Sequence, residues 1–353
     1  MIPHIGWRWF RLLVAVLAVI AAIVPSHVAP APSPRRIVAI GDLHGDHEVW
    51  IALARAAGLI DRKRRWTGGS TVLVQTGDIV DRGPDSRRII DDLMRLEREA
   101  PRSGGRVVVL VGNHEAMMVI GDVRYVHAGE YAAFADRDSS RRRDAAYAAG
   151  RAAIEADFHR QDATLSPAAI RSRWLAQTPL GKIELQAAWM PTGEYGRWIV
   201  ARPAVARIGD TLFVHGGLNA AYARLPIDDI NRRVAAALAA RDVSPTSILD
   251  DPLGPLWYRG LAGMKPEASL ATSSAPLPAV DQQLDDLFAA TGAKRIVIGH
   301  TPLSSGVAVT HKGRLIRVDS GNSRAYGGVP GFIEIMGDRV TAHNIARPGK
   351  EAK

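Results

Sequence analysis

Five apolar, β-type runs in this chain each end in glycine beside an ionisable or amide side chain. These runs with their endings are "IVAIGDLHG" (37–45), "STVLVQTGDIVDRG" (70–83), "GRVVVLVGNHE" (105–115), "TLFVHGG" (211–217) and "KRIVIGHTP" (294–302). Near-continuous Val, Ile and Leu runs are typical of strands buried on both faces. Helical patterns at 47–60 and 85–100 separate the first three runs, and Asp85 or Ser86 is expected to cap the second helix. This alternation predicts an α/β fold around a largely parallel sheet.

The polar residues at the five strand ends point to one shared site. Ligand sites of open α/β sheets lie beyond the carboxyl ends of the strands. The candidate metal ligands at these ends are Asp42, His44, Asp78, Asn113, His215 and His300. Taken singly, a glycine and an aspartate after a strand indicate a turn or a helix cap. Their recurrence at five strand ends favours a functional site.

The residue types at this site predict metal chemistry. Carboxylate, amide and imidazole groups suit Mn²⁺, Fe or Zn²⁺, and the absence of cysteine excludes thiolate-ligated sites. Six ligands are too many for one four-coordinate ion, but they suit two ions that share a carboxylate and act on a phosphoryl group. His114 is placed to protonate a departing oxygen. The pattern therefore predicts two divalent metal ions, with Mn²⁺ preferred and Fe or Zn²⁺ as alternatives.

The first 34 residues differ from the rest of the chain. Arg8 and Arg11 precede an uncharged apolar stretch, 12–24, which a spacer rich in Pro, Ala and Ser follows. This order is typical of a signal peptide or an N-terminal membrane anchor, although a spanning helix needs about 20 residues. We expect an exported protein, either periplasmic or anchored to the membrane by this segment. A buried core helix is the alternative interpretation.

Residues 35–346 are expected to form one domain that carries the site, followed by a tail at 347–353. Between about 121 and 203 the strand patterns give way to Ala- and Arg-rich sequence, which predicts a helical insertion. Strand patterns then return, with hairpin turns at "IGDT", "HKG" and "MGD". The net charge is +9, but the basic residues are dispersed and lack interleaved aromatic residues, so no nucleic-acid partner is expected.

The five motifs together resemble those of the calcineurin-like metallophosphoesterases. "GDIVDRG" and "VHGGL" are similar to the phosphoprotein-phosphatase branch, and "GNHEAMMVIGDVRYV" (112–126) resembles the Shewanella-like protein phosphatases within that branch. The similarity spans about 37–345. It implies an α/β fold of mixed β-sheets sandwiched by helices (α/β/β/α), with the helical insertion added. Pro302 stands where the nucleases and cyclic-nucleotide phosphodiesterases of the superfamily have a second histidine, which agrees with the phosphatase branch.

The resemblance also implies a role for each residue of the site. The implied metal ligands are Asp42 and His44 for the first ion, Asp78 as the bridge, and Asn113, His215 and His300 for the second ion. The implied general acid is His114, and the implied role of Asp81 is to orient it. Arg82 and Arg259 become the residues that hold the phosphate oxygens.

The predicted reaction is hydrolysis of a phosphomonoester in a phosphorylated protein or a small phosphoester. A metal-bridging water attacks phosphorus, and His114 protonates the leaving group. One alternative is a hydrolase of dinucleoside polyphosphates or other small phosphoanhydrides, and another is a membrane-tethered scaffold without catalysis. The stretch "VDSGNSRAYGG" (318–328) receives no chemical role. Asp319 and Tyr326 either border the site or belong to a structural turn, and we favour the turn.

Overall fold

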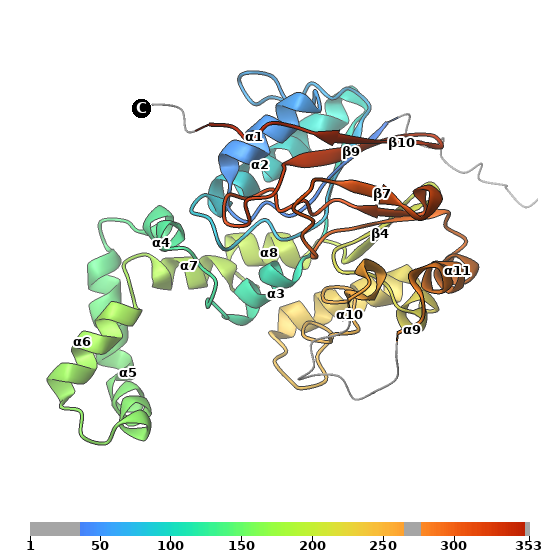
Figure 1. Ribbon diagram of the computed structural model, residues 1–353. Helices are drawn as coiled ribbons and strands as arrows, with labels where there is room; N and C mark the ends of the chain where they lie inside the picture. The colour runs from blue at the N-terminus through green and yellow to red at the C-terminus, as the bar shows by residue number, and fades with distance from the viewer. Residues whose placement is uncertain (1–35, 265–276, 350–353) are drawn as a thin grey trace, which may run out of the picture. The chain divides into compact units, whose positions relative to one another are not determined.

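Strand β1 (Ile37–Ile40) lies at the centre of the first of two five-stranded sheets. It pairs in parallel with β2 (Val72–Gln75), which pairs in parallel with β3 (Arg106–Val109). In the computed structural model, which describes residues 36–264 and 277–349, two antiparallel strands complete this sheet: β9 (Gly331–Met336) beside β1, and β10 (Arg339–Asn344) at the edge. The strand order is β10-β9-β1-β2-β3, and Figure 1 shows β9 and β10 side by side.

The second sheet has the strand order β4-β5-β6-β8-β7. Its strands are β4 (Val205–Ile208), β5 (Thr211–Val214), β6 (Arg295–Ile298), β7 (Ala308–Thr310) and β8 (Leu315–Arg317). The three inner strands are parallel, and the two edge strands are antiparallel to their neighbours. The predicted turns at "IGDT", "HKG" and "MGD" join antiparallel pairs, so these three hairpins are confirmed.

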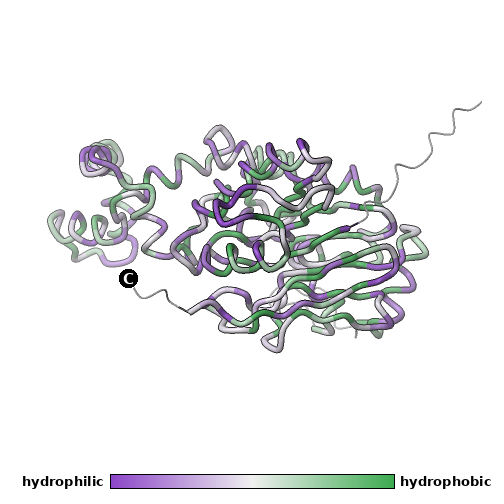
Figure 2. Tube along the Cα trace, turned by 90° about the horizontal axis from the view of Figure 1, so that it is seen from above, coloured by the Kyte–Doolittle hydropathy of each residue, from purple (hydrophilic) through white to green (hydrophobic). Residues whose placement is uncertain are grey.

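The two sheets pack face to face, and the alternation of side chains along the strands explains why. In β1, Ile37 and Ala39 contribute to a core shared with the second sheet, whereas Val38 and Ile40 face the helices on the other side. In β5, Phe213 enters the shared core. Successive side chains of a strand point to opposite faces, so each sheet is apolar on both of its faces, and Figure 2 shows hydrophobic stretches along these strands.

Helices cover the outer face of each sheet. On the first sheet these are α1 (His47–Ala56), α2 (Ser86–Glu99) and α3 (Asn113–Ile120), whose apolar residues share one cluster with β1 and β2. On the second sheet these are α9 (Ala220–Ala223), α11 (Val280–Thr291) and part of α10 (Ile227–Ala240). The predicted α/β class, with mixed sheets sandwiched by helices, is therefore confirmed.

The segment between β3 and β4 contains further helices and no strand among its residues, all of which are described. After α3 come α4 (Ala128–Phe134), α5 (Ser139–Gln161), α6 (Pro167–Gln177), α7 (Lys182–Trp189) and α8 (Glu194–Val200). Helix α4 packs against α2 and α7, and α5 packs against α6 and α7. This contact between α4 and α2 brings the segment close to the loop that follows β2.

One local prediction about a helix end was wrong, and another was confirmed only for the position of the cap residue. The helix predicted over 47–60 ends at Ala56, because Gly58 adopts a left-handed φ of +65° and Ile60 forms a β-bridge with Trp66. Asp85, one of the two predicted candidates, is the N-cap residue of α2, but its side chain makes no capping hydrogen bond. The free Ser86 N–H at this helix start donates instead to the carboxylate of Glu130 on α4.

The predicted export signal or membrane anchor at 1–34 lies outside the described residues. Across the described ranges, 36–264 and 277–349, the longest helix is α5, and it is mostly polar. No helix within these ranges is both long enough and apolar enough to cross a bilayer.

Candidate metal centre

The structure brings all six predicted ligands together beyond the carboxyl ends of β1, β2, β3, β5 and β6. Each is at most 5% exposed. Asp42 accepts the His300 backbone N–H, and its Oδ2 lies 4.0 Å from His44 Nε2. His215 Nε2 lies 2.9 Å from Asn113 Oδ1. These residues come from both sheets, so the site depends on the packing of one sheet against the other.

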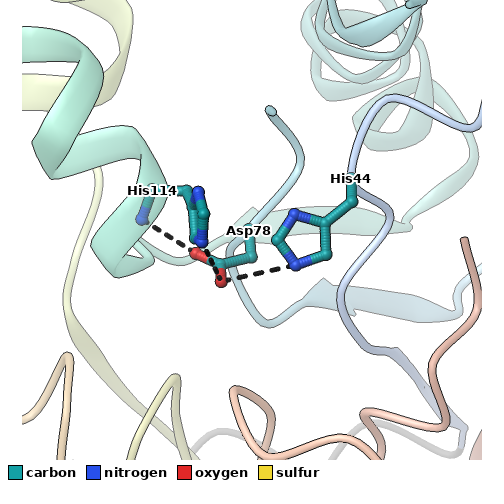
Figure 3. A group of neighbouring side chains, drawn as sticks. All are labelled: His44, Asp78 and His114. Carbon is teal, nitrogen blue, oxygen red and sulfur yellow. Dashed lines mark hydrogen bonds and ion pairs between the residues drawn. The ribbon is translucent and has the colours of Figure 1, made fainter. Parts of the chain in front are cut away.

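Asp78 occupies the middle of the site. Its Oδ1 lies 3.3 Å from His215 Nε2, and its Oδ2 lies 3.7 Å from His44 Nε2 and 3.9 Å from His114 Nε2. Figure 3 shows this carboxylate between the imidazoles of His44 and His114. Within the described residues, two groups of side chains present atoms close enough to hold a metal ion. These groups are His44, Asp78 and His114, and Asp78, His215 and His300. Asp78 is the member that both groups share.

The backbone at the site is strained in a way that aims these side chains. Nine non-glycine residues in the described ranges have a positive φ, and five of them are predicted site residues: His44, Asp78, Asp81, Arg82 and His300. A left-handed φ is unfavourable for such residues, and unusual backbone conformations cost of order 1–3 kcal/mol each. The surrounding structure must therefore hold these turns in place.

Glu115 supplies much of this support. Its buried carboxylate accepts the backbone N–H groups of Asp78 (2.8 Å), Ile79 (2.7 Å) and Gly112 (2.9 Å). It thereby ties the loop after β2 to the first turn of α3. Burial, followed by the charge of Asp78, raises the pKa of Glu115 to about 6. The motif "GNHE" pointed to this segment, but the role of its glutamate depends on contacts with residues more than 30 positions away.

Backbone carbonyl groups orient two of the histidines. His44 Nδ1–H donates to Val80 O, and His215 Nδ1–H donates to Thr76 O, both at 2.9 Å. The Nε2 lone pair of each ring then faces Asp78. A ring nitrogen with a free lone pair is the form that binds a metal ion, and a hydrogen bond at the other nitrogen fixes that tautomer.

Burial and mutual repulsion govern the charges at the site. Burial, then the charges of Asp319 and Asp78, raise the pKa of Asp42 well above its usual value. Burial alone would also raise the pKa of Asp78, but His215, His114 and His44 outweigh it and hold this pKa well below the usual value. Burial lowers the pKa of His44 to about 4. Burial also lowers the pKa of His300 well below its usual value. For His215, burial lowers the pKa, but Asp78 outweighs it and raises this pKa. A bound divalent cation needs all of these imidazoles in the neutral form, and its own charge would favour that form.

The residues therefore fit a divalent metal centre. His300 Nε2 is buried without a hydrogen-bond partner in the described part of the chain, and a bound cation would give this lone pair a partner. The donor set consists of oxygen and imidazole groups, which suits ions such as Mn²⁺, Fe and Zn²⁺. A cation would also offset the repulsion between the buried carboxylates of Asp42, Asp78 and Asp319.

His114 differs from the other histidines in its partner. Its Nδ1–H donates to Asp81 Oδ2 at 2.6 Å, so its Nε2 points toward Asp78 and the centre of the site. Burial lowers the pKa of His114, but Asp78 and Asp81 together outweigh it and raise this pKa above the usual value. A histidine held by a carboxylate and able to stay protonated near neutral pH is suited to donate a proton.

The two predicted phosphate-binding arginines lie at different borders of the site. Arg82 is exposed, and its guanidinium stacks 4.0 Å from the ring centroid of Tyr125 and 5.8 Å from that of Tyr326. Arg259 is half-buried and donates to the backbone carbonyl of His300. Both arginines are thus adjacent to the centre, and neither forms an ion pair in the described residues that would prevent contact with an anion.

Tyr326 lies in a turn, as expected, and both Tyr326 and Asp319 also border the site. The Tyr326 ring lies 5.0 Å from the His44 ring, between His44 and Arg82. Asp319 is buried, and its charge raises the pKa of Asp42. Tyr125 is a further residue that the sequence did not single out, and its ring also lies 5.2 Å from that of His114. The aromatic neighbours of Arg82 were visible only as parts of longer motifs.

The fold and the site together define a class of enzyme. Residues 35–318 match the calcineurin-like phosphoesterase family, and the chain therefore belongs to this family. Relatives of the chain within this family are named as protein phosphatases, which supports the same class for this chain. The chain is therefore a phosphatase.

Two sequence relatives and one solved structure show which members of the family the chain resembles. The chain is 32% identical to Shewanella-like protein phosphatase 2 of Arabidopsis thaliana over 319 residues, which covers 86% of this chain and 76% of the relative. It is 29% identical to Shewanella-like protein phosphatase 1 of Plasmodium berghei over 196 residues, 56% of this chain and 42% of the relative. Among solved structures, the cold-active protein-tyrosine phosphatase of a psychrophilic Shewanella species matches with a TM-score of 0.60 and 25% identity, covering 88% of this chain and 80% of that one. The resemblance to Shewanella-like phosphatases is confirmed.

Proposed function

We propose that this chain is a phosphoprotein phosphatase that hydrolyses phosphomonoesters with two divalent metal ions. One observation carries the proposal: a single buried carboxylate, Asp78, is shared by two groups of side chains that each present metal-binding atoms. Two ions that share a carboxylate are typical of enzymes that displace groups at phosphorus. The proposed ligands are Asp42, His44, Asp78, Asn113, His215 and His300, and Mn²⁺ is the proposed native ion, with Fe or Zn²⁺ as alternatives.

The other side chains of the site have complementary proposed roles. When bound, the ions activate water and neutralise charge on the phosphoryl group. Arg82 and Arg259 bind phosphate oxygens, and the stacking of Arg82 on Tyr125 restricts its guanidinium to the border of the site. His114 donates a proton to the departing oxygen, and Asp81 keeps the His114 ring in the required tautomer and orientation.

A metal-reconstitution assay with a substrate panel tests the proposed function. After chelation, we expect phosphatase activity to fall at least about 100-fold, since metal ions contribute several kcal/mol to this reaction. Added Mn²⁺ should restore activity, and metal analysis should find two ions per chain. The panel contains phosphoserine, phosphothreonine and phosphotyrosine peptides beside diadenosine tetraphosphate. The named relatives, one of them a protein-tyrosine phosphatase, support preferred hydrolysis of a peptide.

The same assay separates the alternatives. A higher kcat/KM for diadenosine tetraphosphate than for every peptide would make the chain a dinucleotide hydrolase. A metal-free protein that stays inactive after Mn²⁺ is added would make it a non-catalytic scaffold.

We further propose that the enzyme acts outside the cytoplasm. The proposal rests on the basic residues, apolar stretch and Pro-rich spacer within 1–34. In fractionated cells, the full-length chain should appear in the periplasmic or membrane fraction, and a chain that begins at Arg35 should stay in the cytoplasm. Recovery of the full-length chain in the cytoplasmic fraction would contradict export.

A further inference from the structure

Glu130 is a buried carboxylic acid that the proposed mechanism does not use. It lies on α4, in the segment between β3 and β4, and its side chain reaches the loop between β2 and α2. The residue is 4% exposed. Its Oε1 accepts the backbone N–H of Ser86, the first residue of α2, where the Asp85 side chain makes no capping hydrogen bond. A buried carboxylic acid at this position is costly unless its remaining polar atoms find partners.

Glu130 and Asp81 both line one small cavity. Its volume is about 10 Å³, roughly the room that one water molecule needs. Its polar lining comes from Asp81, Ser86, Arg87 and Glu130, and apolar side chains that include Met118 and Trp189 make up most of the rest. Asp81 Oδ1 and Ser86 Oγ are both buried and lack a hydrogen bond of good geometry with any described residue. A water molecule in this cavity would meet three polar partners, which is typical of buried water.

Burial and the neighbouring carboxylates favour the protonated form of Glu130. Burial, with added repulsion from Asp81 and Asp85, raises the pKa of Glu130 to about 7, although its hydrogen bonds with Ser86 act in the opposite direction. The charged group that faces it from α2 is Arg87, which lines the cavity, donates to Ala133 O and stacks on Phe134. Below this pKa, Glu130 has a proton to donate, and above it the carboxylate can only accept hydrogen bonds.

We propose that Glu130 is a positioning residue for the Asp81–His114 pair, acting on Asp81 Oδ1 through a water molecule that it holds together with Ser86. This inference rests on the proposed function, in which Asp81 orients the acid His114. Asp81 Oδ2 already accepts the His114 Nδ1–H. A donor at Oδ1 would stop the Asp81 carboxylate from rotating and so keep the imidazole aimed at the leaving oxygen.

Two substitutions at Glu130 separate positioning from bulk structure. Glu130→Gln keeps an acceptor for the Ser86 N–H and a permanent donor for the water molecule, whereas Glu130→Ala removes both. Glu184→Gln is the matched control, because Glu184 also lies in the segment between β3 and β4, on α7, but it accepts from Arg142 and not from the site. All three variants are compared with the metal-loaded wild type on phenyl phosphate, a poor leaving group, and on p-nitrophenyl phosphate, a good one.

We expect Glu130→Ala to lower kcat on phenyl phosphate about 10-fold with KM nearly unchanged, and to lower kcat on p-nitrophenyl phosphate much less. Glu130→Gln should restore most of this kcat. It should also lose less activity than the wild type as the pH rises through about 7, where Glu130 of the wild type becomes a carboxylate. Equal losses on both substrates, or equal losses in the Gln and Ala variants, would overturn the proposal.

A measurement without substrate keeps this inference separate from the proposed function. In protein labelled with ¹³C at the glutamate side-chain carboxyl, the signal missing from Glu130→Gln identifies Glu130. Its titration midpoint should lie near 7, and a midpoint at the ordinary value for glutamate would overturn the proposal even in an active enzyme. A wild type with this midpoint but no phosphatase activity would instead contradict the proposed function, and the positioning role would fail with it.

Discussion

Asp78→Asn is expected to lower phosphatase kcat by at least about 10³-fold while leaving the chain folded. Asp78 is the one carboxylate shared by both groups of metal-binding side chains. An amide can offer one neutral oxygen but cannot neutralise two cations. Loss of several kcal/mol of transition-state stabilisation corresponds to a fall of this size. The readout is kcat on a phosphopeptide in saturating Mn²⁺.

A second readout shows whether the Asn variant fails through metal binding. Mn²⁺ should raise the melting temperature of the wild type, because a ligand that binds only the folded state stabilises it, and this rise should be reduced in Asp78→Asn. Asp92→Asn is the control. Asp92 is also buried, but it pairs with His47 and Arg95, and its pKa is lowered to about 2, against the effect of burial, by hydrogen bonds from these partners. At pH values above the usual carboxylate pKa, Asp92→Asn should have a lower free energy of unfolding than the wild type. It should keep the wild-type kcat. Full activity in Asp78→Asn would contradict its bridging role.

His114→Asn is expected to lower kcat according to how poor the leaving group is. A positioned general acid contributes about 10²–10⁴-fold, so phenyl phosphate and phosphoserine peptides should lose most of this factor. p-Nitrophenyl phosphate needs little protonation and should lose far less. The raised pKa of His114, which Asp78 and Asp81 bring about against the effect of burial, keeps the acid form populated toward higher pH. The wild-type rate on phenyl phosphate should therefore fall as the pH rises through this raised pKa.

Metal content decides between two roles for His114, because this residue also lies in one of the groups that could hold an ion. If His114 is a general acid, the Asn variant should still bind two ions per chain. As a ligand, its replacement would remove one ion and would slow both substrates equally. Asp81→Asn should also lower kcat more for poor leaving groups than for good ones, but to a smaller extent, since it leaves the imidazole present but poorly oriented.

Much of the fold could be predicted from local patterns of apolar residues. Buried strands such as β1, β2 and β6 are encoded by local runs of apolar residues, and a strand buried between a sheet and a helix layer needs apolar side chains on both faces. Helix ends were less predictable. The end of α1 depends on the left-handed Gly58 and on a bridge between Ile60 and Trp66, which are contacts that helical periodicity does not record.

The site was predictable where a residue type and a strand end coincide. Asp42, Asp78 and His215 follow buried strands directly or within a few residues, and strands of parallel type deliver their carboxyl ends to one edge. Tyr326 was not predictable in this way, because it acts through its ring contact with His44, nearly 300 positions away. Glu130 was hidden for the same reason, since nothing in the sequence of α4 indicates that it packs against α2.

The sequence by itself determined which residue types stand at the strand ends, and therefore the oxygen and imidazole chemistry of the site. Only the tertiary structure decided what each of them contacts. Asp78 and Asp81 are three residues apart, yet one is surrounded by histidines from both sheets, and the other holds a single imidazole beside a small cavity. The physical reason is that periodicity sets the local backbone, whereas the direction of a side chain in a strained turn is set by distant groups such as the Glu115 carboxylate.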